Sequence, residues 1–193
     1  MDNLRASSSY RRVIQLLLQH GADVNARDQS HNMPLHLALF ESDTDIVRLL
    51  IEHGADIHAR DENHSTPLHL ASAEGSTKTV QLLIEHGADV HAEDESYSTP
   101  LHLATSKGNA ETIQLLIKHG LDVNACNETH TTPLHLAVSR QEPIPYVVRV
   151  LLERGANVSA EDYKGQTPSQ IASARGHHTI AQLLLDHPSS SVK

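Results

Sequence analysis

The six residues TPLHLA occupy Thr66–Ala71 and return unchanged at Thr99–Ala104 and Thr132–Ala137. A near copy, MPLHLA, begins at Met33, and a more divergent copy, TPSQIA, begins at Thr167. Successive copies start 33 residues apart, except for the last, which starts 35 residues after the fourth. A second phrase, HGADVNA and its variants, recurs with the same spacings. Two phrases with one shared period predict an array of similar structural units.

The unit that begins at Thr66 contains the signals for two helices. Thr66 is a good N-cap residue, Pro67 fits the first helical position, and Gly75 ends the short first helix. The segment 77–86 carries apolar residues for a second helix, and Gly87 can take the left-handed position that ends it. The polar residues that follow are turn formers and are too few for a third helix. Since one unit cannot bury the apolar faces of its helices, the units must stack.

The 33-residue period, the TPLHLA signature and the GADVNA phrase together resemble the ankyrin repeat, over roughly Tyr10 to His187. This resemblance implies an all-α solenoid of helix-turn-helix units with β-hairpin-like fingers. It also implies that the solenoid binds other proteins on its concave side, formed by the fingers and the first helices.

The predicted domain organisation follows the period of the repeat. We expect an N-terminal lead or partial first helix, a half repeat with only a second helix, four repeats, a C-terminal capping repeat and a disordered tail. The repeat domain as a whole spans residues 10–187. In order, the segments are residues 1–9, 10–27, 28–60, 61–93, 94–126, 127–161, 162–187 and 188–193. The half repeat indicates either that residues 2–9 form a makeshift first helix or that the chain was cut from a longer array.

Composition argues against several functional classes. The formal charge of −9 disfavours binding to nucleic acid, which needs clustered Lys and Arg. Cys126 is the single cysteine, so we expect a reducing, cytoplasmic or nuclear location. No segment has the apolar length of a signal peptide or a membrane span. The motifs of common hydrolases, nucleotide-binding proteins and zinc proteases are missing, so we expect no enzyme activity and no cofactor.

Sixteen histidines suggest a metal site, but their register favours a structural role. Equivalent residues of adjacent repeats are separated by the roughly 8–10 Å between packed helices, which is too far to share a zinc ion. The resemblance implies that His36, His69, His102 and His135 of TPLH bond to the preceding Thr and to adjacent backbone. Buried histidines resist protonation, so we expect mild acid to loosen the array.

The loops between repeats carry residues that the repeat does not require. His31, His64, Tyr97 and His130 lie at the expected finger tips, where Gly165 retains the family's usual residue. One interpretation is that a surface turn simply accommodates these residues. The other is that they display their ring side chains to a partner. The resemblance further implies a possible asparaginyl or histidinyl hydroxylation slot at Asn25, His58, His91 and Asn124.

The predicted partner-binding surface combines finger residues with residues at the ends of the first helices. Its members are His31, Asn32, Phe40, Glu41, Glu62, His64, Ala73, Glu74, Glu95, Tyr97, Lys107, His130, Arg140 and Tyr163. The only phenylalanine, Phe40, is either an aromatic anchor or a local packing residue. We expect a monomer. Because the middle fingers are acidic, we expect its protein partner to have a basic segment. The alternatives are a structural spacer or fragment of a larger ankyrin scaffold, and a hydroxylase substrate.

Overall fold

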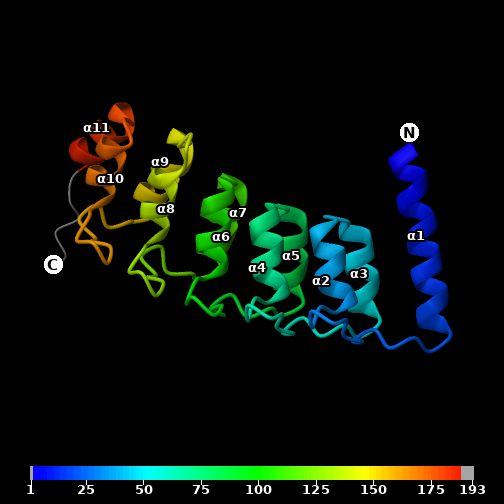
Figure 1. Ribbon diagram of the computed structural model, residues 1–193. Helices are drawn as coiled ribbons and strands as arrows, with labels where there is room; N and C mark the ends of the chain where they lie inside the picture. Colours follow the sequence, from blue (N-terminus) through cyan, green and yellow to red (C-terminus); the bar gives the residue numbers. More distant parts are fainter. Residues whose placement is uncertain (1, 188–193) are drawn as a thin grey trace. The chain divides into compact units, whose positions relative to one another are not determined.

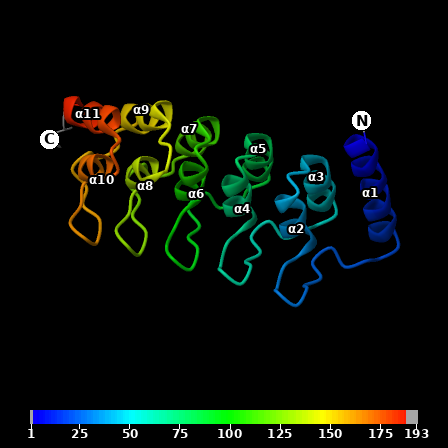
Figure 2. The same cartoon turned by 45° about the horizontal axis from the view of Figure 1, so that its top comes forward.

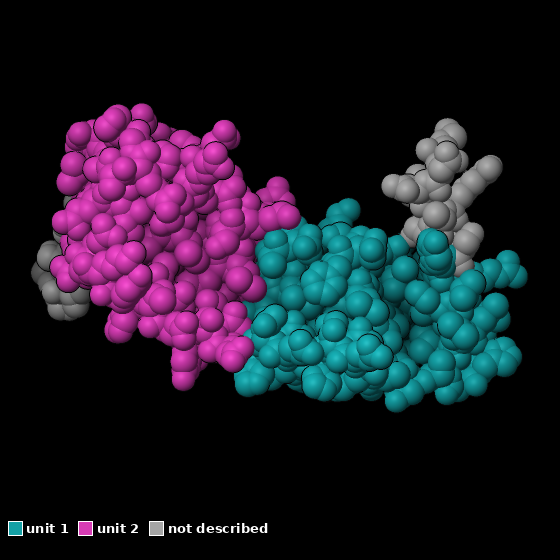
Figure 3. All heavy atoms as spheres, in the orientation of Figure 1, with its two compact units in different colours: residues 1–89 teal, residues 90–193 magenta. Residues whose placement is uncertain are grey.

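The computed structural model describes residues 2–187, including the side chains of residues 10–187, and every regular element in this range is a helix (Figure 1). The all-α prediction is therefore confirmed. The predicted disordered tail, residues 188–193, lies outside the described residues. The chain divides into two compact units, residues 1–89 and 90–193 (Figure 3). None of the helices described is long and apolar enough to cross a membrane.

The first unit contains two complete helix pairs and one additional helix. Its elements are α1 (Asp2–Gln19), α2 (Pro34–Phe40), α3 (Thr44–Glu52), α4 (Pro67–Glu74) and α5 (Thr77–Glu85). Helix α2 packs against α3 and α4, and α4 packs against α5. Helix α3 also contacts α1 and α5, so the first helices form one layer and the second helices another.

The second unit repeats this arrangement with three helix pairs. Its elements are α6 (Pro100–Lys107), α7 (Ala110–Lys118), α8 (Pro133–Ser139), α9 (Pro145–Glu153), α10 (Pro168–Ala174) and α11 (His178–Asp186). The first helices α6, α8 and α10 pack in sequence, and each contacts the second helix of its own pair. In Figure 2 the loops of each unit project away from its helices.

The TPLH phrase at Thr132 starts its helix through a reciprocal pair of hydrogen bonds between Thr132 and His135. The backbone N–H of Thr132 donates to Nδ1 of His135 at 3.2 Å, and the N–H of His135 donates to the Thr132 hydroxyl oxygen at 3.4 Å. This is a capping box in which histidine replaces the usual Glu or Gln. Pro133 takes the first helical position, where no N–H is needed.

The predicted ends of the helices are also confirmed. Gly75 follows α4 with φ of 75°, and Gly87 follows the histidine that caps α5 with φ of 91°. Both are left-handed positions in which glycine is not strained. After α8 the chain differs, because Arg140 is extended and the longer loop leads to α9 at Pro145.

The core is aliphatic, as the shortage of aromatic residues predicts. The leucine of each TPLH phrase is fully buried, at Leu35, Leu68, Leu101 and Leu134. Phe40, by contrast, is 51% exposed. Stacked leucine and alanine layers thus replace the single ring-based core of many globular domains.

The N-terminal segment does not form the makeshift first helix that was one of the two alternatives for residues 2–9. Residues 2–9 continue α1 as one helix, so they do not form a separate first helix. The physical reason is local, since this segment contains neither a glycine nor a proline that would end the helix before Tyr10.

Candidate interaction surface

Each loop between repeats, here called a finger, is closed by an Asp or Asn at its base. In the first finger the carboxylate Oδ1 of Asp28 accepts from the backbone N–H groups of Ser30, at 2.9 Å, and Asn32, at 2.8 Å. The N–H donated by Asn32 is the main reason that the pKa of Asp28 lies below its ordinary value. The equivalent residues Asp61, Asp94, Asn127 and Asp162 bind their fingers in the same way. These side chains therefore belong to the framework, and the described residues contain no strand in the fingers.

The finger tips hold ring side chains in a left-handed backbone conformation. His31, His64, Tyr97 and His130 have φ between 54° and 59°, and Gly165 has 69° at the same position. All four ring side chains are exposed. Glycine adopts this conformation freely, whereas other residues are strained in it. The sequence prediction that these residues occupy finger tips is confirmed, while their role remains a prediction.

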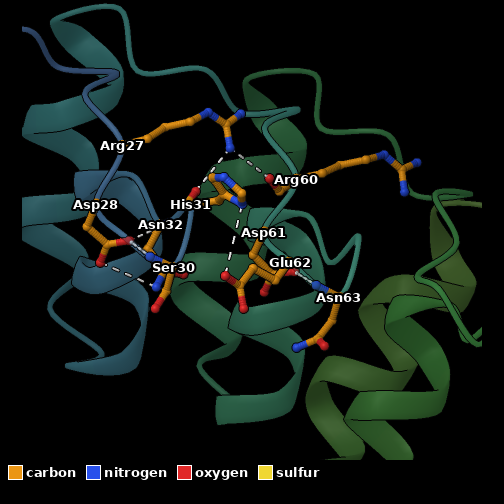
Figure 4. A network of polar contacts seen from close by, with 9 residues as sticks. All are labelled: Arg27, Asp28, Ser30, His31, Asn32, Arg60, Asp61, Glu62 and Asn63. Atoms are coloured by element: carbon orange, nitrogen blue, oxygen red, sulfur yellow. Dashed lines mark hydrogen bonds and ion pairs between the residues drawn. The ribbon is translucent and has the colours of Figure 1, made fainter.

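In the first unit the first two fingers are joined by polar contacts (Figure 4). The Arg27 guanidinium donates to the backbone oxygens of His31, at 3.0 Å, and of Arg60, at 3.1 Å. His31 Nδ1 lies 4.0 Å from a carboxylate oxygen of Glu62 in the next finger. Arg60 repeats the contact within its own finger by donating to the oxygen of His64.

In the second unit backbone hydrogen bonds join adjacent fingers. Glu128 donates its N–H to the oxygen of Ser96 at 2.9 Å, and Tyr163 donates to the oxygen of Thr129 at 3.1 Å. The Tyr163 ring is exposed, and the ammonium group of Lys164 lies 5.2 Å from its centroid. These bonds hold adjacent fingers of the second unit at a fixed spacing.

At the ends of the first helices the predicted residues differ in accessibility. Phe40 and Glu41 are exposed at the end of α2, whereas Ala73 and Glu74 at the end of α4 are half-buried. Lys107 is exposed at the end of α6. Arg140 is half-buried, and its guanidinium donates to the backbone oxygens of Ser106 and Glu142. Arg140 is thus partly committed to the fold, which limits its availability for a partner.

Among the remaining predicted residues, Glu95 is exposed and Asn32 is half-buried. The Asn32 amide lies 3.5 Å from the Asp28 carboxylate, so its side chain contributes to closing the first finger.

The histidines of three of these phrases, His36, His102 and His135, each connect a first helix to the next finger. Nδ1 of His135 accepts from Thr132, so Nε2 carries the proton and donates to the oxygen of Gln166 at 3.1 Å. His36 does the same between Met33 and Ala59, at 3.0 and 3.4 Å. Burial lowers the pKa of both His36 and His135, because their charged forms would lose hydration.

The histidines that follow the second helices cap those helices. The Nδ1 atoms of His20, His53 and His86 lie 2.8–2.9 Å from the backbone oxygen four residues earlier. Each of these oxygens also accepts the backbone N–H of the same histidine, so the ring adds a second hydrogen bond at the helix end. Within the described part of the chain, no group of three or more His, Cys, Asp or Glu residues has the geometry of a metal site.

The two asparagines of the predicted hydroxylation slot bridge neighbouring repeats. Asn124 donates its amide N–H to the oxygen of Gly155 at 3.1 Å and accepts from the N–H of Asn157 at 2.7 Å. Asn25 forms the equivalent pair with residues 54 and 56. His58 and His91 occupy the same slot and are exposed.

Sequence reasoning missed Arg27, which joins two fingers, and it missed the packing of Ile144 beside Gly108. Arg27 was not among the predicted residues, although Arg60 repeats it 33 residues later and thus provided a signal. Ile144 was also missed, and its Cδ1 lies 2.6 Å from where a Cβ on Gly108 would stand. That contact arises only when the longer loop folds back, so no sequence pattern indicates it.

Comparison with known proteins agrees with this architecture. A family model described as ankyrin repeats (3 copies) matches residues 4–94 and 91–162. Two curated relatives, both named Rabankyrin-5, from Mus musculus and Homo sapiens, are 51% identical to this chain over 41 residues. The match covers 21% of this chain and 4% of each relative. Because the family model spans most of the chain, this protein belongs to the ankyrin-repeat family.

Proposed function

We propose that this chain is a non-catalytic module that binds a protein partner through its finger tips and the ends of its first helices. Ankyrin repeats are in general protein-interaction modules, and the finger tips support this role here. Four tips hold ring side chains at positive φ, which costs a residue other than glycine about 1–2 kcal/mol. Gly165 shows that the fold accepts glycine at this position, so stability does not explain the rings. Strain retained at exposed sites supports a role in recognition.

The charge of the surface favours a partner with a basic segment. Glu41 and Glu62 are exposed in the first unit, as are Glu95 and Glu128 in the second. These carboxylates are not the ones that close the fingers, and their exposure supports contact with Lys and Arg of a partner. Phe40 supplies an exposed aromatic anchor of the type that dominates binding energy. The protein acts as a monomer in the cytoplasm or nucleus.

A structural spacer is the second candidate, and one observation favours it. The chain spans only 4% of the length of the curated relatives that it matches. An array inside a long protein can hold other domains apart without binding anything itself. Modification by an asparaginyl or histidinyl hydroxylase is compatible with either role, since the slot lies outside the finger tips.

The test separates recognition from stability by replacing the tip rings with glycine. The variant combines His31→Gly, His64→Gly, Tyr97→Gly and His130→Gly. The control is Ser42→Gly, which removes the same kind of strain at a residue with φ of 54° that lies on no finger. Partners captured from lysate by each protein are quantified by mass spectrometry, and thermal melts are recorded in parallel.

Recognition through the tips predicts a divergence between the two measurements. The tip variant should melt at the same or a higher temperature than the wild type, because the strain is relieved, and should lose its partner. Ser42→Gly should keep the partner. Equal capture by the wild type and the tip variant would refute the proposal and favour the spacer.

A further inference from the structure

A small cavity of about 220 Å³ lies in the second unit, between the last finger and the first helices α8 and α10. Helices α8 and α10 pack side by side, and the last finger leads directly into α10 (Figure 2). Lys164 and Gln166 line the cavity from the finger. Ile171 and the C-cap residue Arg175 line it from α10, and Ser139 lines it from the end of α8. Two cations beside neutral hydrogen-bond donors point to an anionic ligand.

Lys164 distinguishes the last finger from the other four. Counted from the Asp or Asn at the base of each finger, the equivalent residues are uncharged: Ser30, Asn63, Ser96 and Thr129. All five positions make the same framework contact, in which the backbone N–H donates to the side chain at the base. This contact does not involve the ammonium group, so the fold does not require a lysine here. The Lys164 side chain is also exposed.

Arg175 is the second cation of the cavity. The equivalent residues are Glu41 and Glu74 in the first unit and Lys107 and Arg140 in the second. A cation is favourable at the C-terminal end of a helix, but the two glutamates show that the repeat folds without one. The Arg140 guanidinium is bonded to backbone oxygens. Arg175 is exposed, and within the described residues no carboxylate forms an ion pair with it.

Hydrogen bonds join the walls of the cavity to one another. The Nε2–H of His135 in α8 donates to the backbone oxygen of Gln166 at 3.1 Å, which ties the finger to α8. The Nε2–H of His177 donates to the backbone oxygen of Arg140 at 3.1 Å. His177 directly precedes α11, so this bond ties the turn that follows Arg175 to the end of α8. The finger, α8 and the end of α10 are thus connected in one hydrogen-bonded arrangement.

Asp162 sets the net charge of the cavity, since it is the one carboxylate in the lining. Its Oδ1 accepts from the backbone N–H groups of Lys164, at 2.8 Å, and Gln166, at 2.9 Å. Two cations and one carboxylate leave a single net positive charge. One carboxylate of a ligand neutralises this charge, whereas a phosphate dianion would add excess negative charge beside Asp162.

We propose that this cavity binds the carboxylate of a Glu or Asp side chain of a partner protein. The Arg175 guanidinium pairs with the two carboxylate oxygens, since its planar fork matches their geometry. The Lys164 ammonium supplies the second positive charge. The inference rests on the proposed function, because the cavity is part of the same surface of fingers and first-helix ends.

The position of the cavity adds to the expected chemistry of the partner. Backbone hydrogen bonds join the last three fingers in sequence. Along this row the exposed charge changes sign, from Glu95 and Glu128 on the first two of these fingers to Lys164 on the third. A partner segment that lies across the row therefore carries basic residues over Glu95 and Glu128, followed by an acidic residue at the cavity.

The probe is an acetylated and amidated peptide, Gly-Glu-Gly-Glu-Gly, titrated into the isotope-labelled whole protein and followed by NMR at constant ionic strength. Matched peptides carry Gln or phosphoserine in place of both Glu residues. The formal charge of −9 disfavours non-specific binding of an acidic peptide, which makes the test stringent. We expect the Glu peptide to shift the backbone signals of Lys164, Gln166 and Arg175. The Gln peptide should not shift them, and the phosphoserine peptide should bind no more tightly than the Glu peptide.

Two variants test the cations, and a third is the matched control. Lys164→Ser introduces the residue that Ser96 supplies at the same position, and Arg175→Gln removes the second charge. Each should weaken binding of the Glu peptide about two- to fivefold, the effect of one exposed ion pair. Arg149→Gln removes an exposed arginine of α9 that does not line the cavity and should bind as the wild type does. Thermal melts should show that all three variants remain folded, because each replaced side chain is exposed.

Three results of the titration would overturn the proposal. The first is that the Glu peptide shifts none of the three signals. The second is that Arg149→Gln weakens binding as much as Arg175→Gln, which would indicate diffuse attraction. The third is that the phosphoserine peptide binds more tightly than the Glu peptide, which would make a phosphopeptide the ligand.

Capture from lysate separates this inference from the proposed function. The Lys164→Ser/Arg175→Gln variant is compared there with the wild type and with the glycine variant of the finger tips. We expect the double variant to lose most of the partner that the wild type captures. If it keeps a partner that the tip variant loses, the carboxylate site is wrong while the proposed function stands. If the tip variant also keeps the partner, the proposed function fails, and the peptide titration still decides whether the cavity binds a carboxylate.

Discussion

Mild acid should destabilise this protein through the TPLH histidines. Replacing His36 and His135 with glutamine should remove their contribution to this loss of stability. His36 and His135 are 0% and 1% exposed, and burial lowers the pKa of both below the ordinary value of 6.5. In each, Nδ1 accepts a backbone N–H, so a proton on Nδ1 breaks the cap. Gln170 fills the same position in the last repeat, where its Oε1 accepts from the Thr167 N–H at 2.9 Å. Gln170 thus shows that a side chain that does not titrate can form the cap that the histidine forms in the other repeats.

The sign and size of the effect follow from proton binding. A histidine whose pKa is lowered on folding binds fewer protons in the folded state, so its stabilising effect is complete above pH 6.5 and is lost as the pH falls from there toward the folded-state pKa. The slope reaches at most about 1.4 kcal/mol per pH unit for each histidine. Between pH 6.5 and 5.0 the loss is at most about 2 kcal/mol for each of the two. That is a large share of the roughly 5–15 kcal/mol typical of a folded domain.

The assay is urea denaturation of the wild type and the His36→Gln/His135→Gln variant at several pH values from 7.5 to 5.0. At pH 7.5 the variant should be less stable by about 1 kcal/mol per site, because glutamine loses the Nε2 bond to the next finger. As the pH falls, the difference should shrink, because the variant has a flatter pH dependence. His178→Gln, at an exposed position, controls for the loss of a histidine itself. Equal slopes for the wild type and the double variant would refute the reasoning.

Three further changes test the packing and hydrogen bonding of the second unit, each by urea denaturation. Gly108→Ala should cost about 1 kcal/mol more stability than Gly176→Ala. Both glycines have positive φ, but of the two only Gly108 has another residue near the added Cβ, with Ile144 Cδ1 at 2.6 Å. Equal losses of stability would contradict this prediction. Thr105→Val should stabilise by roughly 1 kcal/mol, because its buried hydroxyl has no hydrogen-bond partner among the described residues; a loss of stability would show that the hydroxyl is satisfied. Asn124→Ala should cost about 1–2 kcal/mol by removing both bonds to the next repeat, and a neutral result would show that the bridge is weak in solution.

The repeat unit could be predicted from the sequence because its determinants are local. Thr66 and Pro67 start a helix, Gly75 ends it, and the following apolar pattern makes the second helix, all within one period. The all-α fold and the positions of the finger tips follow from copying that unit. The roles of the predicted partner-binding residues remain predictions, because a partner selects among exposed side chains by its own shape and charge. For Arg140 the structure adds a fact that the sequence lacks, since its guanidinium is already bonded to backbone oxygens.

What the sequence by itself determined is the unit, its caps and its number of copies, since these depend on residues that are near one another in the chain. The tertiary structure decided which copies of an equivalent residue are covered. Leu17 and Leu50 hold the same place in the same phrase, yet one is 55% and the other 2% exposed. Burial is a property of neighbours rather than of a residue, and only the packed chain shows that α3 has a first helix beside it while α1 has an open face.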